Sequence, residues 1–305
     1  ALATGGSRAY LLDERGSPAS DDPMITERCR VPTNGIELDV GIMGPAKGPP
    51  VVLLHGFPET GRCWRHQAPM LASSGFRVIV PEQRGYGRSD KPAGRAAYDI
   101  DVLVADIVGL LDALGHSEAA WVGHDWGGAV TWWAAQHEPA HVRRFAVLNC
   151  PHPTVLARHL LTNPSQMRRS LYMAFFQLPV LPERTLRKDD FRALEQAIQR
   201  SSAPGAYPPE ELAAYKEAWR EPGCVEGMLA WYRAARCFLW RWDTAPIGPP
   251  GLLLWGKRDH ALGPELAEPS VALCRTGHLT WIEEAGHFVQ NDAPERVNVL
   301  LSDFL

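Results

Sequence analysis

The sequence predicts an α/β protein with a mostly parallel, doubly wound sheet and one inserted helical segment. In the first half of the chain, short apolar runs that suit buried strands alternate with segments of helical periodicity, as in repeated βαβ units. A glycine-flanked turn at residues 123–128 joins one such strand to one such helix. From about Pro151 the alternation stops, and it returns near Gly251, which indicates an insertion into the sheet domain.

The individual elements follow from local patterns. Alternation on either side of Asn34-Gly35 predicts a β-hairpin over residues 25–43, because Asn-Gly favours a two-residue hairpin turn. Short apolar runs predict parallel strands buried on both faces. These runs are residues 51–54, 75–80, 119–122, 144–149, 251–255 and 279–282. Apolar residues at helical spacing predict helices at residues 99–114, from about Gly128 to Ala135, and from about Ala293 to the end.

The same patterns predict a domain organisation. Residues 1–23 are small and polar, with many Gly, Ser, Asp and Pro, and we expect a flexible tail. Residues 24–150 and 245–305 are expected to form the sheet domain. Residues 151–244 are aromatic, helical in pattern and interrupted by proline, without a clear buried strand. We expect this segment to form a helical cap over the sheet domain.

Composition excludes several classes of protein. The 305 residues are 45% hydrophobic, which suffices for one full core with an inserted subdomain. A net charge of −4 and a pI of about 6.3 give no reason to expect nucleic acid or an anionic membrane as a partner. No apolar run reaches the roughly 18 residues of a membrane segment, and the N-terminus lacks a signal-peptide pattern. Six scattered cysteines without Cys-x-x-Cys indicate reduced thiols in a cytoplasmic protein. The oligomeric state is open, a homo-oligomer included.

The turn Gly123-His124-Asp125-Trp126-Gly127-Gly128 has the form Gly-x-nucleophile-x-Gly. Such a turn needs small residues on both sides, because the nucleophile adopts a strained conformation and the backbone passes close to itself. Asp125 occupies the nucleophile position, where serine is usual. A carboxylate is ionised near pH 7 and can attack an sp³ carbon directly, leaving an ester on the enzyme. Epoxides and alkyl halides are the natural electrophiles for it.

Further candidates follow the ends of other predicted strands, where functional groups gather in open parallel sheets. Asp259 and His287 come after the last two strands, so the chain order is nucleophile, acid, histidine. We expect His287 to deprotonate the water that hydrolyses the ester, and Asp259 to orient its imidazole. The backbone N–H groups of Phe57 and Trp126 are the expected oxyanion donors.

A literal zinc-protease pattern, H-E-x-x-H, occurs at residues 137–141. The pattern requires one continuous helix so that both histidines share a face, and Pro139 lies within it. We therefore expect the helix to end here. No dinucleotide fingerprint or phosphate-binding glycine loop is found, and neither a metal nor a cofactor is expected.

Over roughly residues 25–305 the chain resembles the epoxide hydrolases of the α/β-hydrolase fold. The motifs that carry this resemblance, besides the contexts of Asp259 and His287, are His55-Gly56-Phe57-Pro58-Glu59, Arg84-Gly85-Tyr86-Gly87, Gly123-His124-Asp125-Trp126-Gly127-Gly128 and Asn149-Cys150-Pro151-His152-Pro153. The resemblance implies conversion of an epoxide to a vicinal diol through an ester on Asp125, with only the epoxide and water as partners. One departure is Glu82-Gln83, where family members often have Asp-x, and we expect it to be a structural variation.

The resemblance also implies two cap tyrosines that hydrogen-bond the epoxide oxygen. Tyr172 precedes Phe176-Gln177-Leu178-Pro179, and Tyr232 lies in Trp231-Tyr232-Arg233. A phenol with a pKa near 10 stays protonated at neutral pH, so it can donate to a departing alkoxide. The expected pocket residues are His152, Phe175, Leu178, Trp231 and Phe238. For His152 a structural role is favoured over a pocket-lining one.

Two other functions remain open from the sequence. Haloalkane and fluoroacetate dehalogenases share the Asp nucleophile, but the former commonly have Asn where this chain has Phe57, and the latter typically have Arg where it has Trp126. A non-catalytic protein of this fold that binds a ligand or partner is the second alternative. Its mark is loss of a triad member, and all three are present.

Overall fold

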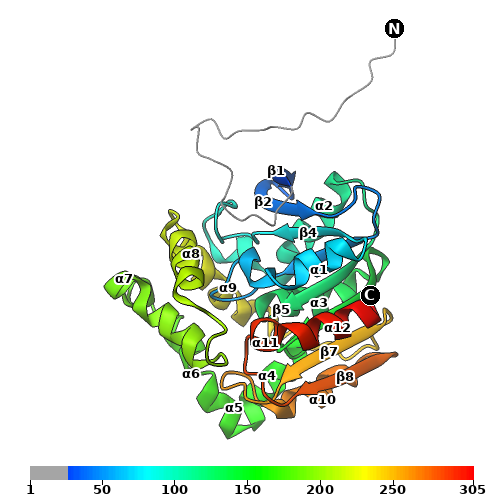
Figure 1. Ribbon diagram of the computed structural model, residues 1–305. Helices are drawn as coiled ribbons and strands as arrows, with labels where there is room; N and C mark the ends of the chain where they lie inside the picture. The colour runs from blue at the N-terminus through cyan, green and yellow to red at the C-terminus, as the bar shows by residue number, and fades with distance from the viewer. Residues whose placement is uncertain (1–26) are drawn as a thin grey trace.

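The computed structural model describes residues 27–305, in which a sheet with helices on both faces carries a group of inserted helices (Figure 1). The predicted tail, residues 1–23, lies outside the described residues. No helix in the described range is both long and apolar enough to cross a membrane.

The sheet has eight strands in the order β1-β2-β4-β3-β5-β6-β7-β8. Its strands are β1 Glu27–Thr33, β2 Ile36–Met43, β3 Pro50–Leu54, β4 Arg77–Pro81, β5 Ala119–His124, β6 Val142–Leu148, β7 Gly251–Gly256 and β8 Gly277–Ile282. β1 and β2 form the predicted hairpin, with positive φ at both Asn34 and Gly35. β2 pairs antiparallel with β4, and every later pairing is parallel, so the predicted fold class is confirmed.

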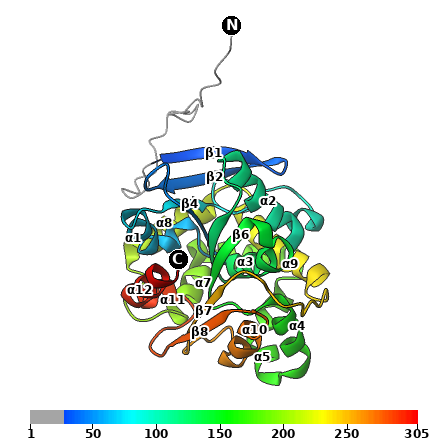
Figure 2. The same cartoon turned by 90° about the vertical axis from the view of Figure 1, so that its right-hand side faces the viewer.

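Helices cover both faces of the sheet. They are α1 Gln67–Ser73, α2 Ile100–Ala113, α3 Trp126–His137, α10 Ala267–Val271, α11 Val289–Asp292 and α12 Pro294–Phe304. Figure 2 shows α1 and α12 on one face and α2 and α3 on the other. Val51 and Leu53 pack in the first of these layers, while Val52 and Leu54 pack in the second, because successive strand residues point to opposite faces. This explains why β3 is apolar throughout.

Two details differ from the sequence prediction. α3 begins at Trp126, two residues before the expected Gly128, because Asp125 already serves as the N-terminal flanking residue of the helix. α1, between β3 and β4, was not predicted; it is a seven-residue helix with proline inside it, too short to give a periodic signal. At the other end of α3 the helix stops at His137, and Pro139–His141 form a separate 3₁₀ turn, as the proline predicted.

The inserted segment between β6 and β7 is helical. Its helices are α4 Pro153–Thr162, α5 Pro164–Arg169, α6 Leu171–Phe175, α7 Leu181–Arg200, α8 Pro209–Arg220 and α9 Cys224–Phe238. Figure 1 shows α6, α7 and α8 together on one side of the sheet. α7 is interrupted where Asp189, Asp190 and Phe191 take positive φ.

Candidate active site

Asp125 stands at the sharp turn between β5 and α3, with φ 49° and ψ −120°. The two motif glycines are required by close approach. A Cβ on Gly123 would lie 2.2 Å from the carbonyl oxygen of Gly127, and a Cβ on Gly127 would lie 2.2 Å from that of Leu54. The turn therefore holds the Asp125 side chain at the carboxyl end of the sheet, in a conformation that a non-glycine residue rarely adopts.

The two oxygens of the Asp125 carboxylate have different partners. Oδ1 accepts a hydrogen bond of 2.7 Å from the backbone N–H of Phe57. Oδ2 lies 3.6 Å from Nε2 of His287. Burial opposes ionisation of Asp125, but the hydrogen bond and charge of His287 outweigh it and lower the pKa of the carboxyl group. A carboxyl group with a lowered pKa is ionised at neutral pH and can act as a nucleophile there.

His287, in the loop after β8, connects Asp125 to Asp259. Its Nδ1 lies 2.8 Å from Oδ2 of Asp259. The other oxygen of Asp259 accepts N–H bonds from Ala261 at 2.7 Å and Leu262 at 2.9 Å, which fix the carboxylate. Burial would lower the pKa of His287, yet the two carboxylates beside it raise that pKa well above its ordinary value. The structure thus brings the three predicted triad residues together.

Two fully buried side chains behind the triad were missed as site residues by sequence reasoning. Nε2 of His124 lies 2.9 Å from the carbonyl oxygen of His287. Nδ1 of His124 lies 3.2 Å from Oε2 of Glu59. Glu59 also accepts hydrogen bonds from the hydroxyls of Tyr207 and Tyr215 in the inserted segment. The only signal in the sequence was that Glu59 and His124 each belong to a motif that carries the family resemblance, residues 55–59 and 123–128, without an assigned chemical role.

The two predicted tyrosines come together near Asp125, whose charge acts on both phenols, although they lie on different helices. Tyr172 is on α6 and Tyr232 on α9, and their ring centroids are 5.8 Å apart. The Tyr232 ring also meets the rings of Trp126 at 5.0 Å and Phe57 at 5.2 Å. Burial, followed by the charge of Asp125, raises the pKa of Tyr172; burial, followed by Tyr172, raises that of Tyr232. Both phenols therefore keep their protons at neutral pH.

The matching family model is described as the alpha/beta hydrolase fold, and it covers residues 49–294. The chain belongs to the α/β-hydrolase family.

Individual relatives point to one group within this family. The hydrolase is 41% identical to the AB hydrolase superfamily protein YfhM of Bacillus subtilis, over 90% of this chain and 96% of that protein. It is 35% identical to epoxide hydrolase 4 of Mus musculus, over 98% and 86% of the two chains. A solved epoxide hydrolase from Bacillus megaterium superposes with a TM-score of 0.82 at 30% identity, over 90% and 99%. The chain is therefore an epoxide hydrolase-like enzyme.

The remaining predicted pocket residues of the hydrolase have varied surroundings. Trp231 is buried and donates its indole N–H to the carbonyl of Arg84 at 2.8 Å, while its ring lies 5.9 Å from that of Trp126. Phe175 is half-buried beside Phe176, at 6.0 Å between ring centroids. Leu178 is 45% exposed. Phe238 is the last residue of α9, and its side chain lies outside the described part of the structure.

His152 is fixed by structural contacts. It caps α4, where its Nδ1 accepts the N–H of Thr154 at 3.2 Å, and its Nε2 lies 2.7 Å from Oε1 of Gln136. Burial lowers the pKa of His152 to about 3, so the ring is neutral. These partners occupy both ring nitrogens and favour the structural reading of this residue.

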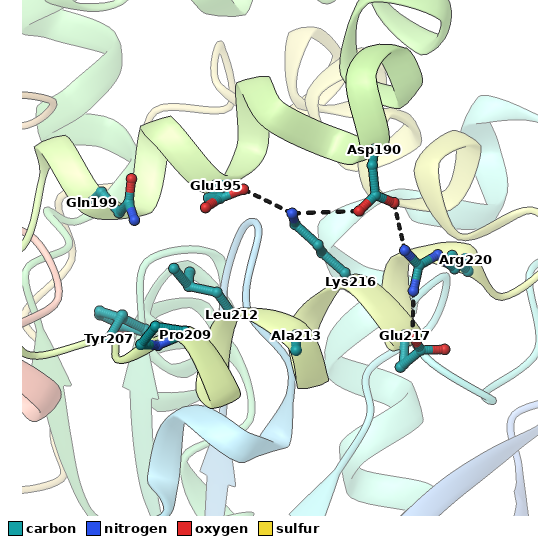
Figure 3. Close-up of a pocket in the computed structure, with 10 residues that line it drawn as sticks. All are labelled: Asp190, Glu195, Gln199, Tyr207, Pro209, Leu212, Ala213, Lys216, Glu217 and Arg220. Atoms are coloured by element: carbon teal, nitrogen blue, oxygen red, sulfur yellow. Dashed lines mark hydrogen bonds and ion pairs between the residues drawn. The ribbon is translucent and has the colours of Figure 1, made fainter.

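A separate hollow of about 380 Å³ lies between α7 and α8. Figure 3 shows Lys216 of α8 reaching Glu195 and Asp190 of α7, with Arg220 also on Asp190. These charges are paired with one another, and the hollow contains none of the triad residues. Elsewhere, among residues 27–305, no cluster of three or more His, Cys, Asp or Glu side chains is arranged to hold a metal ion.

Proposed function

We propose that this enzyme hydrolyses epoxides to vicinal diols through a covalent ester on Asp125. The observation that carries the proposal is the asymmetric setting of the Asp125 carboxylate. Oδ1 accepts the N–H of Phe57, Oδ2 faces His287, and the charge of Asp125 acts on two protonated tyrosines. Each oxygen is thus suited to a different task in the two steps.

In the first step, Oδ2 of Asp125 attacks an oxirane carbon and the C–O bond of the ring breaks. Negative charge develops on the departing oxygen, and Tyr172 and Tyr232 hydrogen-bond to it. One of the two phenols transfers its proton, so the product is a hydroxyalkyl ester. General acid assistance of this kind contributes about 10²- to 10⁴-fold in rate.

In the second step, water attacks the ester carbonyl carbon, which derives from the Asp125 carboxyl group. His287 accepts the proton of that water, and the oxyanion forms on Oδ1, where the Phe57 N–H already points. Trp126 is the first residue of α3, so its backbone N–H lies at the positive end of the helix and adds to the stabilisation. As the intermediate collapses, the bond from its carbon to the alkoxide oxygen breaks and protonated His287 donates to that oxygen, which releases the diol. The carboxyl proton left on Asp125 then restores the tyrosine that was deprotonated in the first step.

The charge of His287 supports the order of these steps. In the free enzyme two carboxylates raise the pKa of His287 well above its ordinary value, despite burial. Ester formation removes the charge of Asp125 and therefore part of this effect. The imidazole becomes a better candidate for a neutral base only after the ester exists, which is when a base is needed.

The residues around Asp125 favour an epoxide over a halide. A halide leaves as a stable anion without a proton, whereas an alkoxide must be protonated, and the two phenols offer that proton. Phe57 stands where haloalkane dehalogenases commonly have Asn, and Trp126 where fluoroacetate dehalogenases typically have Arg. Phe57 lacks the side-chain amide of that Asn, and Trp126 lacks the guanidinium of that Arg. The indole N–H of Trp126 can still serve as one halide donor, but epoxide hydrolases share this residue.

Mass spectrometry of the intact protein tests the proposal. A His287→Gln variant, mixed with a panel of aryl and alkyl epoxides, should gain the mass of one intact epoxide. The same variant with Asp125→Ala added is the control and should gain nothing. Adducts from alkyl halides alone, each with the mass of substrate minus hydrogen halide, would instead support a dehalogenase. No adduct from either class would favour the ligand-binding alternative.

A further inference from the structure

A second set of contacts joins the two tyrosine-bearing helices. Arg233 follows Tyr232 on α9, and its guanidinium makes three hydrogen bonds to the segment after α6. Nε donates to the carbonyl of Phe176 at 3.0 Å, and Nη2 donates to that of Leu178 at 2.7 Å. Nη1 donates to Oε1 of the Glu183 carboxylate at 2.7 Å. One side chain thus holds three points of the α6–α7 connection.

Gln177 spans the same gap in the opposite direction. Its Nε2 donates to the backbone carbonyl of Tyr232 at 2.9 Å and to that of Met173 at 3.1 Å. Arg233, next to Tyr232, therefore hydrogen-bonds to the end of α6, while Gln177, just after α6, hydrogen-bonds to the backbone of Tyr232. The Phe176 ring packs against both tyrosines, with its centroid 4.9 Å from that of Tyr232 and 5.6 Å from that of Tyr172.

α6 needs such external support. It has only five residues, and helices much shorter than about 12 residues are not stable by themselves. The last carbonyls of a helix also lack partners within the helix. Arg233 and Gln177 supply donors to carbonyls at the end of α6 and just beyond it, so the position of Tyr172 depends on α9.

We propose that Arg233 and Gln177 are positioning residues that set the separation of Tyr172 and Tyr232, so that both phenols reach one epoxide oxygen. This inference rests on the proposed function. Arginine is suited to the task because its planar fork presents several donors at fixed angles, whereas lysine presents a single ammonium group. An Arg233→Lys variant retains a cation for Glu183 but cannot serve both carbonyls at once.

The role predicts a defect in one chemical step only. Ester formation depends on both tyrosines, whereas ester hydrolysis uses His287, Asp259 and the Phe57 N–H. The hydrogen bonds of Arg233 and Gln177 described above involve none of these three groups. A displacement of about 1 Å in a reacting group can cost on the order of 100-fold. We expect Arg233→Lys to slow ester formation by about 10- to 100-fold and to leave ester hydrolysis within about twofold of wild type.

The chain contains a matched control. Arg187 of α7 pairs with Glu226 of α9, so it joins the same two helices as the Glu183–Arg233 pair. Arg187 is exposed, however, and it bonds a carboxylate rather than a backbone carbonyl. Arg187→Gln removes this ion pair and should leave both steps within about twofold of wild type. Gln177→Met is the second test variant, and it should slow ester formation in the same direction as Arg233→Lys, by a smaller factor.

Single-turnover measurements separate the two steps. Ester formation is followed by mass spectrometry in the His287→Gln background, and ester decay is followed by rapid quench with His287 intact. Ester formation in Arg233→Lys and Gln177→Met at the rate of Arg187→Gln would overturn the positioning role, as would equal slowing of both steps. A His287→Gln parent that forms no ester from any epoxide would overturn the proposed function and this inference together. If Arg233→Lys does not fold, Gln177→Met decides the outcome.

Discussion

Asn149 donates from Nδ2 to Oδ2 of Asp259 at 2.9 Å, and the same carboxylate oxygen faces Nδ1 of His287 at 2.8 Å. Oδ1 of Asn149 accepts the N–H of Gly256 at 2.8 Å, so one side chain joins the ends of β6 and β7. Its backbone has φ 42°, a conformation that Asn tolerates better than most residues. Asn149 therefore orients the acid of the triad while occupying a strained position itself.

This arrangement predicts that Asn149→Ala is more damaging than Asn149→Gly. Both variants lose the hydrogen bonds to Asp259 and Gly256, but glycine adopts positive φ without strain. We expect Ala to destabilise the protein by about 1 kcal/mol more than Gly, measured by urea unfolding. Equal stability of the two variants would contradict the role assigned to the backbone. Both should slow ester hydrolysis more than ester formation, because Asp259 serves the histidine.

Removal of the phenol hydroxyls should act on the opposite step. Tyr172→Phe and Tyr232→Phe each retain the ring contacts and lose only the donor. We expect ester formation to fall by about 10²-fold for each, with a larger loss in the double variant. The matched control is Tyr98→Phe, a buried tyrosine outside the site. Unchanged ester formation in the double variant would rule out the proposed role of the phenols.

The pH dependence should also separate the steps. Ester hydrolysis requires neutral His287, so it should fall as pH drops below the pKa that this residue has in the ester form, by about tenfold per pH unit. Ester formation requires ionised Asp125, whose pKa is lowered because His287 outweighs the effect of burial. Its rate should therefore change much less between pH 8 and 5. Rapid-quench kinetics of a single turnover at several pH values measure both, and parallel loss of the two rates would refute the assignment.

Glu82 should make stability depend on pH. Burial raises its pKa from the ordinary 4.5 to about 7, against the opposing charge of Arg28. Nε2 of His55 lies 3.5 Å from Oε2 of Glu82. The charge of Asp39 raises the pKa of Glu82, and the charge of Lys91 lowers it. The folded protein therefore binds this proton more tightly than the unfolded chain does. The free energy of unfolding should fall as pH rises from about 4.5 to 7, by up to about 3 kcal/mol.

Glu82→Gln removes the titrating group and keeps an oxygen for the Gly61 N–H, which now bonds Oε1 at 3.1 Å. Relative to wild type, the variant should gain stability between pH 5 and pH 8 in urea unfolding. Glu283→Gln, at an exposed ion pair with Lys257, is the control and should give no such gain. A constant difference between Glu82→Gln and wild type across this range would show that Glu82 does not titrate there. The departure at Glu82-Gln83 would then be a packing variation only.

The strand segments along the chain and the place of the turn at Asp125 could be predicted because each depends on local signals. Strands buried on both faces are continuous apolar runs, and a Gly-x-Asp-x-Gly turn is constrained by contacts within a few residues. The approach of His287 to Asp125 could be predicted as well, since both follow strands whose carboxyl ends share one edge of the sheet.

Other parts depend on contacts between distant segments, which no local pattern records. The joint role of Glu59 and His124 arises only when β3, β5 and the loop before α11 meet. The sequence could not decide whether His152 caps a helix or lines the pocket. The structure decides it through the contacts of His152 with Gln136 and Thr154. The short helices α1 and α6 lack the length for a periodic signal and are held by their surroundings.

The position of the inserted helices in the chain also determines the order in which the two sides of the sheet become available during translation. β6 ends at Leu148 and its parallel partner β7 begins at Gly251, so α4–α9 are synthesised before β6 can pair on that side. Until then β6 is an open edge of the growing sheet, which is a site where unfinished chains associate. Asp125, Tyr172 and Tyr232 are synthesised before Asp259 and His287. The pairing of β6 with β7 and the approach of Asp259 and His287 to Asp125 therefore both wait until the inserted helices have been synthesised.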